Sequence, residues 1–279
     1  MDLFVYLIAL IWIVLALIQD LKTREIWNWV NFSLLVVGLT YKSLIAISEK
    51  SLETFIFTIL GVCMMIIFAN LLYYTRTFAG GDAKLLIALA SVLPYYSWID
   101  SLAVPLLFVF GLFFVGALYS LVYSTFIVAK NRKGFSKEFR KNFRKNKVWM
   151  VVGAILGILL IFVIRENYGI IFGLLFVLFP WIYVYLRAVE EGCMIVSVKP
   201  GELGEGEWLY RSVKIGRRVI RNGVHGLSKE EIKIIRRGGK NVLIRQGIPF
   251  TPAFLIIWVI MVYVYLVLEI HISEFFALF

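Results

Sequence analysis

Long runs of apolar residues are the feature of this sequence that most restricts its fold. Most of them approach or exceed the roughly 20 helical residues needed to cross a hydrocarbon core about 30 Å thick. The eight runs occupy residues 3–19, 29–47, 54–73, 84–98, 102–129, 148–164, 169–187 and 253–272. The composition agrees, because 61% of the residues are hydrophobic and only 17% are charged, whereas soluble domains are about half apolar and a quarter charged. The sequence therefore predicts a multi-pass membrane protein.

The connections between these runs alternate in charge, and this alternation predicts the membrane topology. The fifth connection, residues 130–147, carries nine basic residues and one acid, whereas the even-numbered connections hold almost no basic residues. An excess of lysine and arginine in short loops marks the cytoplasmic side. We therefore expect the odd-numbered connections in the cytoplasm and both termini outside it, in the plasma membrane. We interpret the net charge of +11 as topology plus attraction to anionic lipid at the cytoplasmic face, and we expect no nucleic-acid partner.

The polar region before the last apolar run is expected to form a small cytoplasmic α/β module. Two stretches rich in β-branched residues and bounded by glycine or proline are the expected strands, at 193–200 and 241–250. Between them, Ser228 and Glu231 form the pattern of a capping box at a helix start. Basic residues fill the last turn of that helix, and Gly238 or Gly239 is expected to end it.

These elements together predict an all-α polytopic membrane protein of about eight transmembrane helices, with the α/β module inserted before the last helix. Four regions are expected: a membrane core at 1–129, a basic cytoplasmic loop with two additional transmembrane helices at 130–188, the module at 189–250, and the last helix with an outer tail at 251–279.

Two carboxylates are expected at the same face of the membrane. Asp20 ends the first apolar run, and Asp82 follows Gly80 and Gly81 at the start of the fourth. Each aspartate taken singly also fits a simple role at a helix end, but ionisable residues close to hydrocarbon are costly and are functional candidates by default. The two glycines allow backbone geometry closed to other residues and close approach by a peptide.

A pair of neighbouring carboxyl groups can hydrolyse a peptide bond. Two such groups cannot both ionise easily, so one of them keeps a proton. The ionised partner can draw a proton from water while the protonated one polarises the substrate carbonyl. This chemistry needs no metal and no cofactor. The histidines, His225 and His271, lie far apart without ligand-like spacing, and we expect no zinc site.

Three motifs resemble the type IV prepilin peptidase family of membrane aspartic proteases, in its archaeal prepilin/preflagellin branch. The stretch "AGGDAKLLIAL" is similar to the family's glycine-rich turn, aspartate, lysine and apolar helix. The stretch "QDLKTREIWN" resembles its first motif, and "GIPFTPAFLI" resembles its proline-rich entry into a late helix. Two residues depart from the pattern, because Ala79 stands where the family has glycine and Trp27 where it has proline.

The resemblance implies a function and a set of site residues. Asp20 and Asp82 would be the catalytic pair of an aspartic-type endopeptidase. The residues that would bind substrate or shape the site are Gly80, Gly81, Lys84, Arg24, Asn28, Pro249, Phe250 and Pro252. The substrates would be pilin-like precursors with a short basic leader, cut at the cytoplasmic face, or archaellin-like precursors processed by the same chemistry.

Other functions remain open on the sequence alone. A presenilin-like intramembrane protease shares the aspartate and glycine pattern but needs its aspartates deeper in the bilayer. A proton-coupled transporter also places two carboxylates in the membrane, and it predicts internal repeats with broken helices near the midplane. A non-catalytic assembly scaffold is the remaining alternative.

Overall fold

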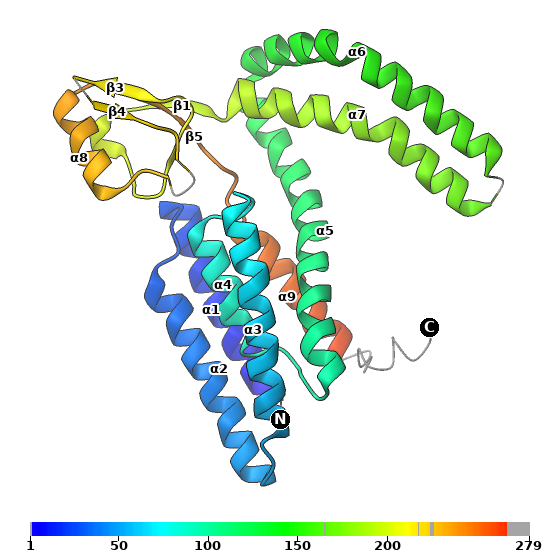
Figure 1. The fold of residues 1–279 in the computed structure, drawn as a ribbon, viewed down its shortest axis with the longest axis vertical. Coiled ribbons are helices and arrows are strands. Elements are labelled where there is room, and N and C mark those ends of the chain that lie inside the picture. Colours follow the sequence, from blue (N-terminus) through cyan, green and yellow to red (C-terminus); the bar gives the residue numbers. More distant parts are fainter. Residues whose placement is uncertain (1, 165, 217, 224–225, 267–279) are drawn as a thin grey trace. The chain divides into compact units, whose positions relative to one another are not determined.

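The computed structural model describes residues 2–164, 166–216, 218–223 and 226–266. The chain divides into two compact units. Figure 1 labels the helices and strands of both. The first unit comprises residues 1–121 together with 248–279, and the second comprises residues 122–247. His225 and His271 lie outside the described residues, and so does the end of the predicted last apolar run, residues 267–272. The expected division into four regions stays a prediction.

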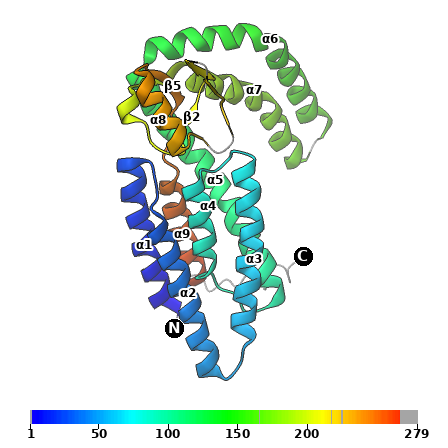
Figure 2. The ribbon, with the colours of Figure 1, turned by 60° about the vertical axis from the view of Figure 1, so that its left-hand side comes forward.

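The first unit is built from helices. They are α1 (Asp2–Thr23), α2 (Asn28–Glu49), α3 (Glu53–Tyr74), α4 (Gly80–Ala90), the first part of α5 (Trp98–Lys130) and α9 (Thr251–Leu266). The short helix α4 packs against α2 and α3, and α1 packs against α9, although α1 and α9 come from opposite ends of the chain. Figure 2 shows α4 lying among these longer helices.

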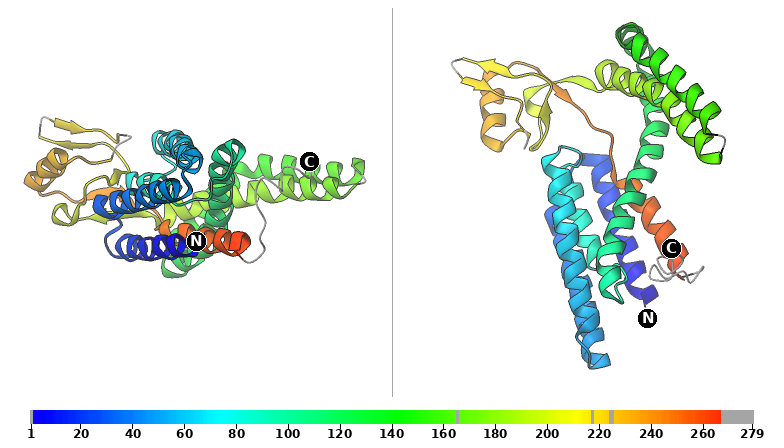
Figure 3. Two further views of the ribbon diagram at one scale, coloured as in Figure 1. Left: turned by 90° about the horizontal axis from the view of Figure 1, so that it is seen from below. Right: turned by 45° about the vertical axis from the view of Figure 1, so that its right-hand side comes forward.

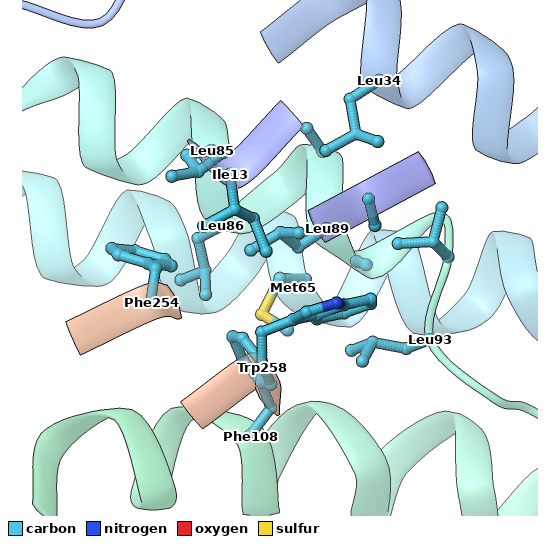
Figure 4. Close-up of a cluster of buried hydrophobic side chains, with 14 of the residues drawn as sticks. Ile13, Leu34, Met65, Leu85, Leu86, Leu89, Leu93, Phe108, Phe254 and Trp258 are labelled. Atoms are coloured by element: carbon cyan, nitrogen blue, oxygen red, sulfur yellow. The ribbon is translucent and has the colours of Figure 1, made fainter. Parts of the chain in front are cut away.

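The core of the first unit is centred on α4. Its leucines Leu85, Leu86 and Leu89 are fully buried, and they meet side chains of α1, α2, α3, α5 and α9 (Figure 4). Because lipid tails are as apolar as leucine, helices in a membrane associate through close van der Waals packing rather than through the hydrophobic effect. Packing of its buried residues against these helices therefore holds α4 in place, and Asp82 lies in its first turn.

The fourth apolar run, which is short and interrupted by Pro94, was expected either to tilt or to end early, and as a helix it ends early. Helix α4 ends at Ala90, and the chain is not helical again until Trp98, where α5 begins. Pro94 lies in this interval, and a proline disfavours helical backbone in the residue that precedes it. The predicted run 84–98 is therefore one short helix followed by a loop.

The second unit begins with the end of α5 and continues with a helical hairpin formed by α6 (Arg132–Val163) and α7 (Asn167–Cys193). These two helices run side by side, as the green hairpin of Figure 3 shows. Residues 132–147 were expected to form a loop but are the first half of α6. Lysine and arginine are good helix formers, and the side chain of Asn131 caps the helix by accepting the N–H of Gly134 at 3.2 Å.

The α/β module follows the hairpin and includes both predicted strands. Its elements are β1 (Ile195–Val198), a 3-10 turn η1 (Pro200–Glu202), β2 (Trp208–Leu209), β3 (Val213–Ile215), β4 (Arg218–Ile220), α8 (Lys229–Gly238) and β5 (Val242–Arg245). Strand β5 lies between β1 and β2 in an antiparallel sheet, and β3 pairs with β4. The predicted capping box of Ser228 and Glu231 is present, and Gly239 ends α8 with a φ of 65°.

The eight predicted apolar runs correspond to helices α1–α7 and α9, so the predominantly helical fold is confirmed. Among the described residues, six of these helices are long and apolar enough to cross a membrane: α1, α2, α3, α5, α6 and α7. The described part of α9 has 16 residues, and α4 has 11. The chain is a multi-pass membrane protein with a small sheet region toward its C-terminus.

Candidate active site

Asp20 lies in the last turn of α1 and is buried, with 7% of its surface exposed. Its Oδ2 accepts two hydrogen bonds from one residue, Thr251, which is the first residue of α9. The main-chain N–H of Thr251 donates at 3.1 Å and its hydroxyl Oγ1 donates at 2.7 Å. The end of the first helix and the start of the last described helix are therefore joined at this carboxylate, across 231 positions of sequence.

Asp82 lies in the first turn of α4 and is partly buried. The main chain of Ala79, the residue that caps this helix, is a polar neighbour of its carboxyl group. Asp20 is close enough for its charge to act on the Asp82 carboxyl. The two carboxylates that the sequence singled out therefore lie within electrostatic range of each other.

Gly81 allows a close approach between the two sequence motifs. A Cβ atom at this position would lie 3.2 Å from Cβ of Ile26 and 3.4 Å from its main-chain nitrogen. The amide Nδ2 of Asn31 also approaches, and donates to the carbonyl oxygen of Gly81 at 3.4 Å. At Gly80 the nearest atom to such a Cβ belongs to Tyr73, at 3.7 Å, which is ordinary contact.

The expectation of unusual backbone geometry at the two glycines is not met. Among the described glycines, those with positive φ are Gly206, Gly216, Gly226 and Gly239. Gly80 and Gly81 instead begin α4 with helical backbone. Close packing against Ile26 is therefore the physical reason for a glycine at position 81, beside Asp82. The close approach expected of a peptide substrate is here made by another part of the same chain.

Lys84 and Asn28 form a second link between the motifs. The Lys84 ammonium donates to Oδ1 of Asn28 at 2.7 Å, at an exposed position. Arg24 lies just beyond α1 with a φ of 56°, and its N–H donates to the carbonyl oxygen of Asp20 at 2.9 Å. This left-handed residue closes the end of the helix, so Arg24 shapes the turn through its main chain.

The two departures from the family pattern fit the backbone that the structure adopts. Ala79 has a φ of −70° and a ψ of 160°, an extended conformation open to any residue. Trp27 has a φ of −67°, close to the value that proline would fix. Trp27 also donates its N–H to Oε1 of Gln19 at 3.0 Å, a hydrogen bond that proline could not make.

The third motif forms the entry to α9. Pro249 is buried, and Pro252 lies in the first turn of α9, where a missing N–H costs nothing. The ring of Phe250 lies 5.2 Å from that of Phe78, four residues before Asp82. The motif therefore packs beside the segment that leads into α4.

Two residues of this site, Thr251 and Asn31, were not predicted from the sequence. Thr251 lies inside the third motif, between Phe250 and Pro252, which the resemblance did select. A hydroxyl residue at the start of an apolar helix is a recognisable signal, but its partner is far away in sequence. Asn31 is an amide inside an apolar run, and it is 1% exposed.

Comparison with known proteins gives matches in the same part of the chain. Residues 7–121 match the type IV leader peptidase family. A preflagellin peptidase of Methanococcus voltae is 27% identical over 134 residues, which are 45% of this chain and 57% of that protein. A preflagellin peptidase of Methanocaldococcus jannaschii is 30% identical over 94 residues, 33% of this chain and 39% of that protein. No solved structure matches.

The chain spans little more than half of the first relative and about two fifths of the second. The matched family segment nevertheless contains both aspartates, the glycine pair and the turn that follows α1. The resemblance indicated by the aspartate motifs is therefore confirmed, because residues 7–121 are similar to the type IV leader peptidase family.

Proposed function

We propose that this protein is a membrane aspartic endopeptidase that removes short basic leaders from type IV pilin-like or archaellin-like precursors. The observation that carries the proposal is the meeting of Asp20 and Asp82, one buried and one partly buried, inside the segment that matches the leader peptidases. Residues Gly80, Gly81, Lys84, Arg24, Asn28, Pro249, Phe250 and Pro252 would shape the site around them.

The proposed reaction uses the carboxylates as an acid and a base. The ionised carboxylate takes a proton from a water molecule, whose oxygen attacks the carbonyl carbon of the scissile bond. The protonated carboxyl donates a hydrogen bond to the carbonyl oxygen and stabilises the tetrahedral intermediate. A proton then passes to the amide nitrogen, the C–N bond breaks, and the products are a carboxylic acid and an amine. No covalent enzyme intermediate and no cofactor is needed.

The proposed substrates follow from the relatives and from the charge distribution. Both relatives are preflagellin peptidases, so an archaellin precursor is the first substrate to try, and a pilin precursor the second. Basic residues of the odd-numbered connections are proposed to lie in the cytoplasm, which puts the start of α4 and the end of α1 at that face. A leader that remains in the cytoplasm would meet the site there.

The basic first half of α6 is proposed to lie against anionic lipid at the same face. Its lysines and arginines are exposed on a helix that continues directly into an apolar segment. Basic residues close to a membrane each contribute about 1 kcal/mol to binding of anionic lipid. Binding of the protein to vesicles with and without anionic lipid measures this contribution, which high salt should reduce.

The function is tested by cleavage of a precursor in membranes that contain the protein. Asp20→Asn and Asp82→Asn should each lower the rate by at least about a thousandfold, because amides cannot exchange the required protons. Loss of the leader is followed on a gel and by mass spectrometry. Full activity in either variant would contradict the aspartate mechanism, and ion flux without cleavage would favour a transporter.

Asp100 offers a matched control for these substitutions. It is another buried aspartate of the first unit, 4% exposed, and its Oδ2 accepts the N–H of Tyr96 at 3.1 Å. The Asp100→Asn variant keeps an oxygen that can accept this bond. It should cleave the precursor at nearly the wild-type rate, which would show that the loss at Asp20 and Asp82 is specific to the site.

A further inference from the structure

The contact between Thr251 and Asp20 has a geometry suited to holding a reacting carboxylate. Both residues are buried, with Thr251 at 0% and Asp20 at 7% exposure. Both donors of Thr251, the N–H at 3.1 Å and the hydroxyl at 2.7 Å, reach the same oxygen, Oδ2. Hydrogen bonds to a charged acceptor are shorter and about twice as strong as those between neutral groups.

The two helices that carry this contact, α1 and α9, also pack against each other farther along their length. Tyr6 of α1 and Trp258 of α9 meet edge to face with ring centroids 6.0 Å apart, and Trp258 Nε1 donates to the carbonyl oxygen of Tyr6 at 3.3 Å. The first N–H groups of a helix lack partners within it. The N–H of Thr251, the first residue of α9, is therefore available to bind the Asp20 carboxylate. The helix dipole also favours a negative charge at this end.

We propose that Thr251 is a positioning residue for the Asp20 carboxylate, and this inference rests on the proposed function. A carboxylate oxygen has two lone pairs in its plane, and Thr251 occupies those of Oδ2. The plane of the carboxylate is thereby fixed, and Oδ1 is left as the oxygen that exchanges the proton with water. Both donors of Thr251 go to Asp20, so this arrangement distinguishes Asp20 from Asp82.

The hydroxyl is the part of Thr251 that substitution can isolate. Valine has nearly the same shape and keeps the N–H, but it lacks the hydroxyl that donates at 2.7 Å. Serine keeps the hydroxyl and loses only a methyl group. A loss of positioning affects the chemical step, and misplacement of a reacting group by about 1 Å can cost a hundredfold in rate.

The experiment compares kcat and KM for a precursor in Thr251→Val and Thr251→Ser. We expect Thr251→Val to lower kcat by about 10- to 100-fold with KM changed less than about threefold, and Thr251→Ser to stay within about threefold of the wild type in both. Equal kcat in Thr251→Val and the wild type would overturn the inference. An equal loss in Thr251→Ser would also overturn it, because the methyl group and not the hydroxyl would then matter.

Two further variants separate the possible failures. Thr58→Val removes another fully buried hydroxyl, one that donates to Thr54 of its own helix at 2.8 Å, and it should keep the wild-type kcat. The thermal unfolding temperature of every variant in detergent shows whether it is folded, and Thr251→Ser remains informative if Thr251→Val does not fold. If Asp20→Asn is inactive while Thr251→Val is fully active, only the positioning role fails. If Asp20→Asn is active, the proposed function itself fails.

Discussion

The two aspartates lie within reach of each other's charge, yet the protein holds them in different ways. Asp20 is fixed by direct hydrogen bonds from Thr251 to one of its oxygens. Asp82 is fixed mainly through the main chain that carries it, where Gly81 packs on Ile26 and accepts a hydrogen bond from Asn31. The first arrangement depends on two donors of one residue, and the second depends on the space available beside the start of α4.

Substitution of Gly81 by valine should have the largest effect on the Asp82 side. A Cβ there would already lie 3.2 Å from Cβ of Ile26, and the methyl groups of valine need more room. Overpacking of this kind costs about 1–3 kcal/mol, and the displaced start of α4 would move Asp82. We expect a 10- to 100-fold lower cleavage rate and a lower unfolding temperature, measured by a precursor assay and thermal unfolding in detergent.

Gly80→Ala is the matched control for this prediction. The nearest neighbour of an added Cβ is Tyr73 at 3.7 Å, so the methyl group meets no obstacle. Alanine is also a better helix former than glycine by about 0.5–1 kcal/mol in a helix interior, and Gly80 begins α4. The control should keep its activity and its unfolding temperature. Similar damage from both substitutions would mean that packing on Ile26 is not the reason for the glycine.

Asn31→Leu should have a smaller effect, because the hydrogen bond that it removes is long. Asn31 donates to the carbonyl oxygen of Gly81 at 3.4 Å, and its Oδ1 is buried without a hydrogen-bond partner among the described residues. Loss of one hydrogen bond costs about 1 kcal/mol, and removal of an unpaired buried oxygen offsets part of that cost. We expect a cleavage rate less than about fivefold lower, measured with the same precursor.

Asn31→Asp sharpens the comparison, because it changes only the chemistry of the amide. The aspartate cannot donate to Gly81 when ionised, and it adds a carboxylate next to the start of α4. Buried carboxylates without a partner are costly, so this variant should lose more activity than Asn31→Leu. The opposite order would show that the amide supports the site through more than the bond to Gly81.

Local patterns in the sequence predicted much of the fold. Apolar runs indicated the helices, and the strands β1 and β5 and the capping box of α8 were expected from their residue types. The sequence did not predict that residues 132–147 continue as a helix, because a dense run of basic residues is compatible with either a loop or a helix. Pro94 indicated that the fourth run could end early, and α4 does end before it, at Ala90.

The site was predictable only in part, because its contacts connect distant positions. The aspartates were found because carboxylates are unusual beside apolar helices. The bond from Thr251 to Asp20 spans 231 positions, and no periodic pattern marks such a pair. Trp27 was a departure from the family pattern, and only the structure relates it to a φ near that of proline and to the N–H bond with Gln19.

The link between Lys84 and Asn28 should contribute least, although its bond is among the shortest in the site at 2.7 Å. Both side chains are exposed, and exposed polar pairs contribute about 0.2–1 kcal/mol, since water competes for each partner. Lys84→Met, Asn28→Ala and the double variant form a cycle that isolates the coupling. We expect a coupling below about 1 kcal/mol from thermal unfolding and cleavage rates within about threefold of the wild type.

A larger effect of Lys84→Met alone would identify a role for its charge that does not depend on Asn28. If the ammonium contacted the substrate, KM would rise while the unfolding temperature stayed unchanged, and Asn28→Ala would not reproduce the change. If the bond only ties α2 to α4, the two single variants and the double variant should behave alike. We expect the variants to behave alike, because packing around Gly81 already holds the start of α4 against Ile26. The exposed bond between Lys84 and Asn28 then adds little to the position of Asp82.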